Sequence, residues 1–419
     1  MSNIHDTVPV VGTERQTLSE GERRPARPGI LFFLAVVLLG ANLRAVFSSL
    51  PPLLEDVRAD LGLSAAAAGL LTTLPLLCFG LLAPVAPALI RRISIEQLLG
   101  ACLALTAFGT GLRGIGGTAG LFAGTLVAGS AVAIAQTTVP TLIRVRFPGH
   151  SGSLTGAFSM ALPLGAAVAA AVAVPLERLF DDSWRAALAV FAVPALVAAV
   201  LWLPPATRER TVVRHAQSFG FHNLARSWSL AAYFGLQSMV FYCGLTWLPT
   251  ILQHEGYSKA TSGSLLALVS ALQLAPAMLV PVVASRLRNQ RPMLLVVVAF
   301  TAAGFLGLLL APGAAVVWMI VIGLGQGGAL GLGLILPVLR GAGAAAVAAL
   351  TALTLSVGYL LASAGPTLLG LARDGTGGWT VPRVALIAIT LAELVPGWKA
   401  TASWTIGDAD LEPMTAVEP

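Results

Sequence analysis

The sequence predicts an all-α integral membrane protein with twelve transmembrane helices, arranged as two parallel six-helix repeats. Three observations lead to this fold class. The composition is far more apolar than that of a soluble domain. The apolar residues fall into twelve runs that are long enough to cross a bilayer, and the second half of the chain repeats the pattern of the first.

The composition excludes an ordinary soluble protein. Of the 419 residues, 56% are hydrophobic and 11% are charged, and the mean hydropathy is +0.84, whereas soluble domains carry about 25% charged residues. The net charge of +6 does not indicate a nucleic-acid partner, because the arginines lie in small groups between apolar runs. The three cysteines show no metal-ligand spacing. We therefore expect a membrane-lipid environment and no cofactor, metal or nucleic acid.

The transmembrane helices follow from the lengths of the apolar runs. A helix needs about 20 mostly apolar residues to cross the hydrocarbon core, and twelve runs approach or exceed this length. They are residues 29–54, 65–90, 95–112, 118–141, 153–175, 184–204, 229–252, 261–284, 292–311, 314–338, 345–370 and 379–398. The third and the twelfth are the least apolar, since each carries a carboxylate near an end, Glu96 and Glu393 respectively.

The basic residues outside the spans predict the orientation. Seventeen of the lysines and arginines lie on the side of the two termini, and seven lie on the other side. Because cytoplasmic loops are enriched in these residues, we predict a multi-pass protein of the cell membrane with both termini in the cytoplasm. Residues 1–28 lack a short apolar core with a cleavage site, so we expect no cleaved signal peptide.

The chain divides at a polar segment between the sixth and seventh runs. GLSAAAAGLL, which starts at Gly62, aligns with GYSKATSGSL, which starts at Gly256. Parallel six-helix repeats of this kind place a substrate site between the halves, near the bilayer midplane. The predicted parts are a cytoplasmic tail (1–28), a six-helix bundle (29–204), a cytoplasmic linker (205–228), a second six-helix bundle (229–398) and a cytoplasmic tail (399–419).

Four stretches carry a resemblance to a known family. They are NLRAVFSSLPPLLEDVRADLGLS from Asn42, AGLLTTLPLLCFGLLAPVAPALIRR from Ala68, FGLQSMVFYCGLTWLPTILQHEGYS from Phe234 and SVGYLLASAGP from Ser356. They resemble the cyanate and nitroimidazole transporter branch of the major facilitator superfamily. The resemblance runs from about residue 30 to residue 385, so it does not reach the end of the twelfth run. It implies the major facilitator fold and a small solute such as cyanate or a nitroaromatic heterocycle.

Arg44 is the most informative single residue. A charge at the centre of a membrane helix costs about 2.5–3.5 kcal/mol on insertion scales, and Arg44 lies roughly 22 Å along the first helix. Residues three and four positions apart share a helix face, so Phe47 and Ser48 lie beside Arg44. We interpret this face as the wall of a water-filled cavity for an anionic or strongly dipolar ligand. The alternative is an arginine whose donors are satisfied by helix-terminal carbonyl groups.

The second repeat predicts the opposite wall of the cavity. Aligning Leu50-Pro51 with Leu248-Pro249 places Tyr242 opposite Arg44. Polar residues at helical spacing also favour contacts from the eleventh helix and from the fourth, where they precede Pro140. The predicted substrate-binding residues are Arg44, Phe47, Ser48, Gln136, Gln237, Phe241, Tyr242 and Tyr359.

The remaining charged residues are assigned to loops and tails. Apart from Glu96 and Glu393, the acidic residues lie outside the predicted spans, as do the five histidines. We therefore expect no buried carboxylate as an internal proton carrier, and proton coupling and passive transport both stay open. Arg91, Arg92 and Arg286 follow the second and eighth spans, and the resemblance implies that these loops lock the halves when the cytoplasmic face is closed.

One motif resembles a nucleotide-binding fingerprint. GLGQGG, residues 323–328, fits G-x-G-x-x-G, but it lies inside the tenth apolar run and not between a strand and a helix. Small residues at this spacing favour close helix packing. Gln326 within the motif is a further candidate for the cavity wall.

Taken together, the residues predict a monomeric secondary transporter for a small polar or anionic solute, working by alternating access, and no enzyme. An exporter of drug-like heterocycles, a channel and a purely structural membrane protein are the alternatives. The residues do not select the solute, the direction of transport or the coupling ion.

Overall fold

The computed structural model describes residues 30–82, 85–147, 150–208 and 226–407. Within these ranges the regular secondary structure is helical, and a single isolated bridge joins Gly341 to Ile406. The N-terminal half comprises α1 (Ile30–Ser48), η1 (Pro51–Leu53), α2 (Leu54–Leu61), α3 (Ala65–Leu82), α4 (Ala86–Ile90), α5 (Ile95–Leu112), α6 (Gly117–Arg146), α7 (Ser151–Leu179), α8 (Trp184–Val190) and α9 (Ala192–Arg208).

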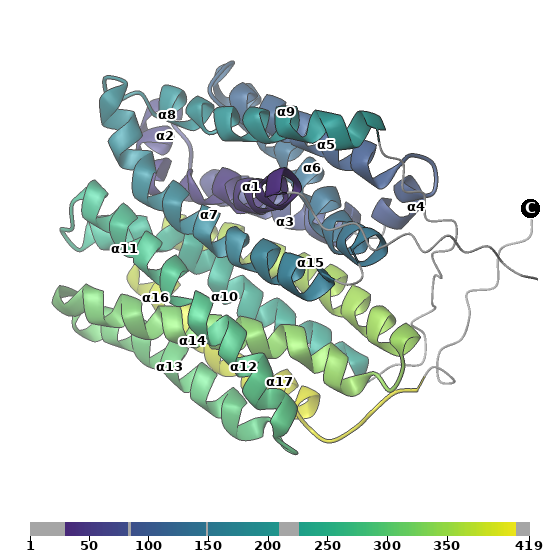
Figure 1. Cartoon of the computed structure of the whole chain (residues 1–419). Helices are drawn as coiled ribbons and strands as arrows, with labels where there is room; N and C mark the ends of the chain where they lie inside the picture. Colours follow the sequence, from purple (N-terminus) through teal and green to yellow (C-terminus); the bar gives the residue numbers. More distant parts are fainter. Residues whose placement is uncertain (1–29, 83–84, 148–149, 209–225, 408–419) are drawn as a thin grey trace, which may run out of the picture.

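The C-terminal half repeats this order of long helices. It comprises α10 (Ser227–His254), α11 (Lys259–Leu272), α12 (Leu274–Arg286), α13 (Arg291–Leu310), η4 (Pro312–Ala314), α14 (Ala315–Arg340), α15 (Ala344–Thr376), α16 (Thr380–Ala392) and α17 (Leu394–Ala400). Figure 1 shows the purple and blue helices of the N-terminal half lying above the green and yellow helices of the C-terminal half. The all-helical prediction is confirmed, and the predicted linker falls largely on residues outside the described ranges.

Eleven helical units of the described chain are long and apolar enough to cross a membrane, and α10 is the remaining long helix. Its 28 residues correspond to about 42 Å of helix, which is more than the hydrocarbon core requires. Nearly all its side chains are buried, and it packs against α11, α14, α15, α16 and α17. Polar residues are tolerated in α10 because this helix faces protein instead of lipid. The predicted count of twelve spans is consistent with this arrangement.

Prolines explain where the spanning units break. Pro194, Pro276 and Pro396 each lie four positions after the last residue of a helix, namely α8, α11 and α16. A proline has no N–H group to bond to the carbonyl four residues earlier, and its ring clashes with that carbonyl. The sixth, eighth and twelfth spans are therefore each divided into two helices.

The first span also differs from its prediction as a continuous run over 29–54. Helix α1 ends at Ser48, and a 3₁₀ turn over Pro51–Leu53 leads into α2. Pro51 and Pro52 cannot donate the backbone hydrogen bonds that would continue the α-helix.

Two pairs of helices join the halves. Helix α3 packs along α15, and α7 packs along α11, as Figure 1 shows for the second pair. Glycines bring the first pair into backbone contact: a Cβ atom on Gly69 would lie 2.5 Å from the Pro366 carbonyl oxygen, and one on Gly370 would lie 2.4 Å from that of Ala65. Such small residues allow membrane helices to approach closely.

Polar contacts tie the halves together at the end of the bundle opposite the chain termini. Lys259 of α11 forms ion pairs with Asp56 and Glu177 of the N-terminal half. Asp374 of α15 accepts hydrogen bonds of 3.0 and 2.9 Å from the first two backbone amides of α3. A carboxylate at a helix N-terminus satisfies unpaired N–H groups and interacts favourably with the helix dipole. This end of the bundle is therefore closed.

The twelfth span, which the family resemblance did not reach in full, is formed and packed. Helix α16 contacts α13, and α17 contacts α10. Arg340 at the end of α14 donates to Gln290 at 2.7 Å and to the Ala400 carbonyl oxygen at 3.0 Å. Backbone hydrogen bonds then join Ile406 to Arg340 and Ala342. The segment after α17 is thus attached to the end of α14.

We predict that Gly69→Ala lowers the melting temperature of the purified protein by several degrees, because overpacking a tight contact costs typically 1–3 kcal/mol. The matched control is Gly375→Ala in α15, where an added Cβ meets no atom within 4 Å. Alanine is the better helix former by up to about 1 kcal/mol, so this control should melt at the wild-type temperature or above it. Equal melting temperatures for both variants would contradict the backbone contact between α3 and α15.

Candidate functional site

The centre of the candidate site is a contact between the halves. Arg44 of α1 donates a hydrogen bond from Nη1 to the hydroxyl oxygen of Tyr242 in α10, at 2.5 Å. This is the pair that the alignment of the two repeats placed opposite each other. Among the described residues, no acidic side chain forms an ion pair with Arg44. The guanidinium therefore retains donors that a ligand could use.

Aromatic rings surround the guanidinium on the C-terminal side. Its Cζ atom lies 5.9 Å from the ring centroid of Phe241 and 5.6 Å from that of Tyr242, which is within the range of cation–π attraction. Tyr359 of α15 lies close enough to interact electrostatically with Arg44, and its ring centroid is 6.3 Å from that of Tyr242.

A chain of rings continues this wall across the interface. The Phe79 ring centroid lies 5.8 Å from that of Phe47 and 5.2 Å from that of Tyr359, and the Tyr359 ring in turn lies 5.4 Å from Phe234. Phe47 and Phe79 belong to the N-terminal half, while Tyr359 and Phe234 belong to the C-terminal half. The structure therefore gathers Arg44, Phe47, Phe241, Tyr242 and Tyr359 into one cluster.

The other predicted binding residues lie less directly at this cluster. Ser48 is buried at the last position of α1. Gln237 is buried and donates from Nε2 to the adjacent Ser238 at 2.7 Å, while its Oε1 atom has no partner. Gln136 in α6 is half-buried with an unpartnered Oε1 atom, and no hydrogen bond of the described chain joins it to Arg44. A role in substrate binding stays a prediction for these three residues.

The predicted gating arginines lie at the end of the bundle that carries the chain termini. Arg91 and Arg92 follow α4, Arg286 is the last residue of α12, and all three are exposed. Among the described residues, these three arginines form no ion pair with the other half. Their gating role stays a prediction.

Sequence reasoning missed the polar contacts of α3 with the other half. Thr72 lies 2.9 Å from Thr246 of α10, measured between the hydroxyl oxygens. Thr73 donates to the Ser363 carbonyl oxygen at 2.6 Å and lies 2.9 Å from the Thr367 hydroxyl oxygen. The two threonines lie in an apolar run without charge, and only the contact of α3 with α10 and α15 reveals their partners.

Arg113 is a second buried arginine, which follows α5 as predicted but whose burial was not predicted. Arg113 is 2% exposed, and its Nη1 atom donates a hydrogen bond of 2.6 Å to the Val46 carbonyl oxygen, near the end of α1. A cation is favourable at a helix C-terminus, so this arginine stabilises the end of α1. It also lines a small pocket with Phe47, Phe79 and Tyr242.

The assignment of Glu177 to a loop was wrong. Glu177 is buried because α7 continues to Leu179, and it pairs with Lys259. Glu96 is buried and pairs with Arg146 at 3.1 Å. Glu393 is buried at the break between α16 and α17, and its Oε1 atom has no hydrogen-bond partner. Apolar run lengths alone do not show how far a helix extends or what covers its end.

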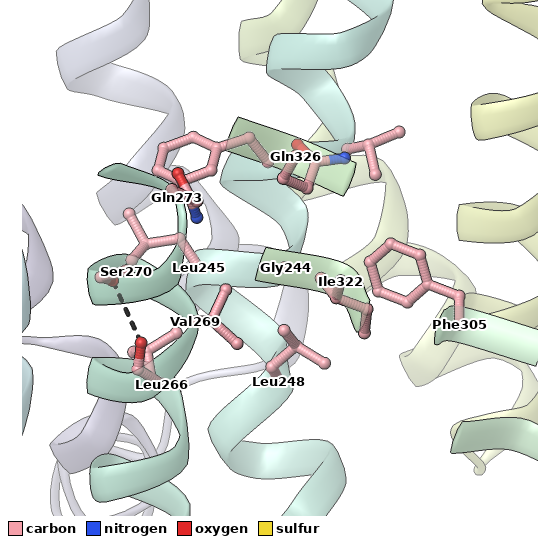
Figure 2. Close-up of a pocket in the computed structure, with 12 residues that line it drawn as sticks. Gly244, Leu245, Leu248, Leu266, Val269, Ser270, Gln273, Phe305, Ile322 and Gln326 are labelled. Atoms are coloured by element: carbon pink, nitrogen blue, oxygen red, sulfur yellow. Dashed lines mark hydrogen bonds between the residues drawn. The ribbon is translucent and has the colours of Figure 1, made fainter. Parts of the chain in front are cut away.

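A second pocket lies beside the cluster, inside the C-terminal half. Figure 2 shows Gln273 and Gln326 approaching it from two helices, with Gly244, Leu248 and Ile322 among the residues below them. Its free space is about 10 Å³, close to the room that one water molecule needs. The Nε2 atom of Gln273 and both amide atoms of Gln326 are buried without a partner. Each such atom costs about 1–3 kcal/mol when it stays unpaired.

The groups of this cluster are suited to binding a ligand that carries a negative charge or a strong dipole. A guanidinium offers planar, paired donors that match carboxylate-like or nitro-like oxygens, and the rings supply flat apolar walls. In the part of the chain that the structure describes, no group of three histidine, cysteine, aspartate or glutamate residues could hold a metal ion.

Comparisons with known proteins identify a family. The profile of the Major Facilitator Superfamily matches residues 32–390. The chain is 35% identical to the 2-nitroimidazole transporter of Escherichia coli (strain K12), over 88% of this chain and 94% of that protein. It is 32% identical to the cyanate transport protein CynX of the same organism, over 83% and 91%. A crystal structure of a bacterial homolog to the human lysosomal transporter Spinster, inward-facing and occupied, has a TM-score of 0.76 at 15% identity and covers 88% of this chain and 96% of its own.

We predict that Arg44 and Tyr242 are energetically coupled. A double-mutant cycle of Arg44→Gln and Tyr242→Phe, measured as the free energy of unfolding in detergent, should give an interaction of about 1.5–3 kcal/mol, because the hydrogen bond involves a charged donor. The control pairs Arg44→Gln with Tyr257→Phe, whose hydroxyl group bonds to Pro312 at 2.9 Å. That cycle should be additive within about 0.5 kcal/mol. Additivity in both cycles would show that the Arg44–Tyr242 contact is not formed.

Proposed function

The chain belongs to the major facilitator superfamily, and we propose that it is a secondary transporter that moves a small anionic or strongly dipolar solute across the cell membrane by alternating access. Its relatives are named as transporters, so the protein is a transporter of solutes and not an enzyme. The solute, its direction and any coupling ion are the parts of this proposal that need experiment.

The proposal rests on one observation, which is that the buried guanidinium of Arg44 has no partner of opposite charge among the described residues. A guanidinium inside a transmembrane bundle is costly, and here a phenol and aromatic faces are its visible partners. Neither neutralises the positive charge. A solute with electron-rich oxygens would complete the set of hydrogen bonds and compensate the charge, which gives the site an affinity for such solutes.

The relatives indicate the chemical class of the solute. One is named for 2-nitroimidazole and the other for cyanate. Cyanate is a small anion, and the nitro group of the heterocycle presents two electron-rich oxygens in one plane. Both can accept hydrogen bonds from a guanidinium. We propose that Arg44 binds this part of the solute and that Phe241, Tyr242 and Tyr359 form the facing wall.

The ties at the end of the bundle opposite the termini support alternating access. Lys259 and Asp374 hold the halves together there, so this end is closed, and a solute at Arg44 would exchange at the end that carries the termini. If the termini lie in the cytoplasm, as the basic residues predict, the closed end is the outer one. A proton-linked cycle would need a titrating group, and the buried, unpartnered Glu393 is the candidate for it.

We predict that Arg44→Gln reduces uptake of both cyanate and 2-nitroimidazole into proteoliposomes at least tenfold, because the charged hydrogen-bond donor is lost. Uptake is measured with and without an inward proton gradient, and stimulation by the gradient would support proton coupling. Arg178→Gln, an exposed arginine of α7, is the control and should transport normally. Equal uptake by wild type and a well-folded Arg44→Gln protein would refute the proposed site. Preferred outward movement would identify an exporter, and flux without saturation a channel.

We also predict that Lys259→Gln opens the closed end. The test introduces Thr250→Cys, at a buried position of α10 two turns beyond Tyr242, into protein whose three native cysteines are replaced by alanine. Without the cation, Asp56 and Glu177 face each other unpaired, and the labelling rate of the new cysteine by a water-soluble thiol reagent should rise severalfold. Lys259→Arg keeps the charge and should restore slow labelling. A labelling rate that does not respond to Lys259→Gln would remove this ion pair from the gate.

A further inference from the structure

The pocket of Figure 2 contains polar groups that the proposed site does not use. Gln273 is 6% exposed and Gln326 is 3% exposed. The Nε2 atom of Gln273 and both side-chain amide atoms of Gln326 have no hydrogen-bond partner. Exchanging the nitrogen and oxygen of Gln326 would not help, since both positions are unpaired. Buried amides that stay unpaired are rare in proteins unless water or a ligand completes them.

The fold brings these two amides together by specific means. Gln273 sits at the break between α11 and α12, which Pro276 causes. Gln326 lies in the glycine-rich stretch GLGQGG of α14. A Cβ atom on Gly327 would lie 2.4 Å from the backbone oxygen of Gln273, and one on Gly323 would lie 3.0 Å from the Leu272 Cβ atom. The glycines of GLGQGG thus allow α14 to pack closely against the helix break at which Gln273 lies.

The pocket and the Arg44 cluster share Phe241. This ring lines the pocket, and its centroid lies 5.9 Å from the Arg44 guanidinium. The two amides and the arginine are therefore neighbours of the same ring. The remaining walls are apolar, among them Leu245, Leu248 and Phe305.

We propose that Gln273 and Gln326 form a second subsite, which binds the hydrogen-bonding edge of a neutral heterocycle whose electron-rich group is held by Arg44. This inference rests on the proposed function and narrows it. An imidazole ring carries one N–H donor and one nitrogen acceptor, and a pair of amides offers the matching acceptor and donors. Cyanate has three atoms in a line and no donor, so an ion held at Arg44 leaves the amides unpaired.

The pocket has to widen for such a ring, since its free space now suits one water molecule. The elements around it allow this. Gln273 lies at a helix break, where a span bends more easily than inside a continuous helix. In this structure both amides line a pocket that is too small for such a ring.

The test compares KM for 2-nitroimidazole and for cyanate in proteoliposomes containing wild type, Gln326→Met or Gln273→Met. Methionine keeps the length of the side chain and removes the amide. We expect the KM for 2-nitroimidazole to rise about tenfold in each variant, which is the loss of one hydrogen bond, and the KM for cyanate to stay within twofold. Gln253→Met, which also removes an unpartnered amide but lies three turns along α10 from Phe241, is the matched control and should leave both values unchanged.

Thermal stability separates a ligand site from a structural one. Replacing a buried, unpaired amide by an apolar side chain of similar shape is neutral or stabilising, so Gln326→Met should melt no lower than wild type while its KM for 2-nitroimidazole rises. An unchanged KM for 2-nitroimidazole, or equal rises for both solutes, would overturn the subsite. Wild-type transport of cyanate alone would also overturn it and leave the proposed function intact. Transport of neither solute by wild type would overturn both.

Discussion

The structure depends on the way in which a positive charge is kept inside the bundle. Arg44 donates to Tyr242 at 2.5 Å and lies against the faces of two aromatic rings. These partners solvate the guanidinium without cancelling its charge, so the free energy of burial is offset only in part. The contact also links α1 of one half to α10 of the other. This one interaction therefore lowers the free-energy cost of burying the charge and joins the two halves. It also leaves a positive charge that would attract an electron-rich solute.

This arrangement leaves N–H donors of Arg44 available to a solute beside the protein's own contact with Tyr242. A ligand that binds these donors meets a charge that is already out of water. The arginine is already oriented by its neighbours, so little conformational entropy is lost when the ligand arrives.

Much of the fold could be predicted from the sequence, and so could the centre of the site. The apolar runs predicted the spans, and the internal repeat placed Tyr242 opposite Arg44, because parallel repeats put equivalent positions across one axis. The burial of Arg113 and Glu177 was not predicted, because their side chains are covered by neighbouring helices beyond the ends of the apolar runs. The meeting of Gln273 and Gln326 was not predictable either. It depends on a proline break in one helix and a glycine contact in another, and neither is visible along a single segment.

The proposed Arg44 site lies between the halves, whereas the proposed amide subsite lies inside the C-terminal half, and this bears on how a solute would drive the conformational cycle. A ligand shifts an equilibrium only by the difference in its affinity for the states. A small anion at Arg44 would be held between the arginine and the facing wall of the C-terminal half. A heterocycle that also engages Gln273 and Gln326 would gain further contacts with the C-terminal half, and its binding would be strongest when the halves close around it. Such solutes would therefore favour the closed intermediate between the two open states, and the two amides would give this chain a physical means of distinguishing them from simple anions.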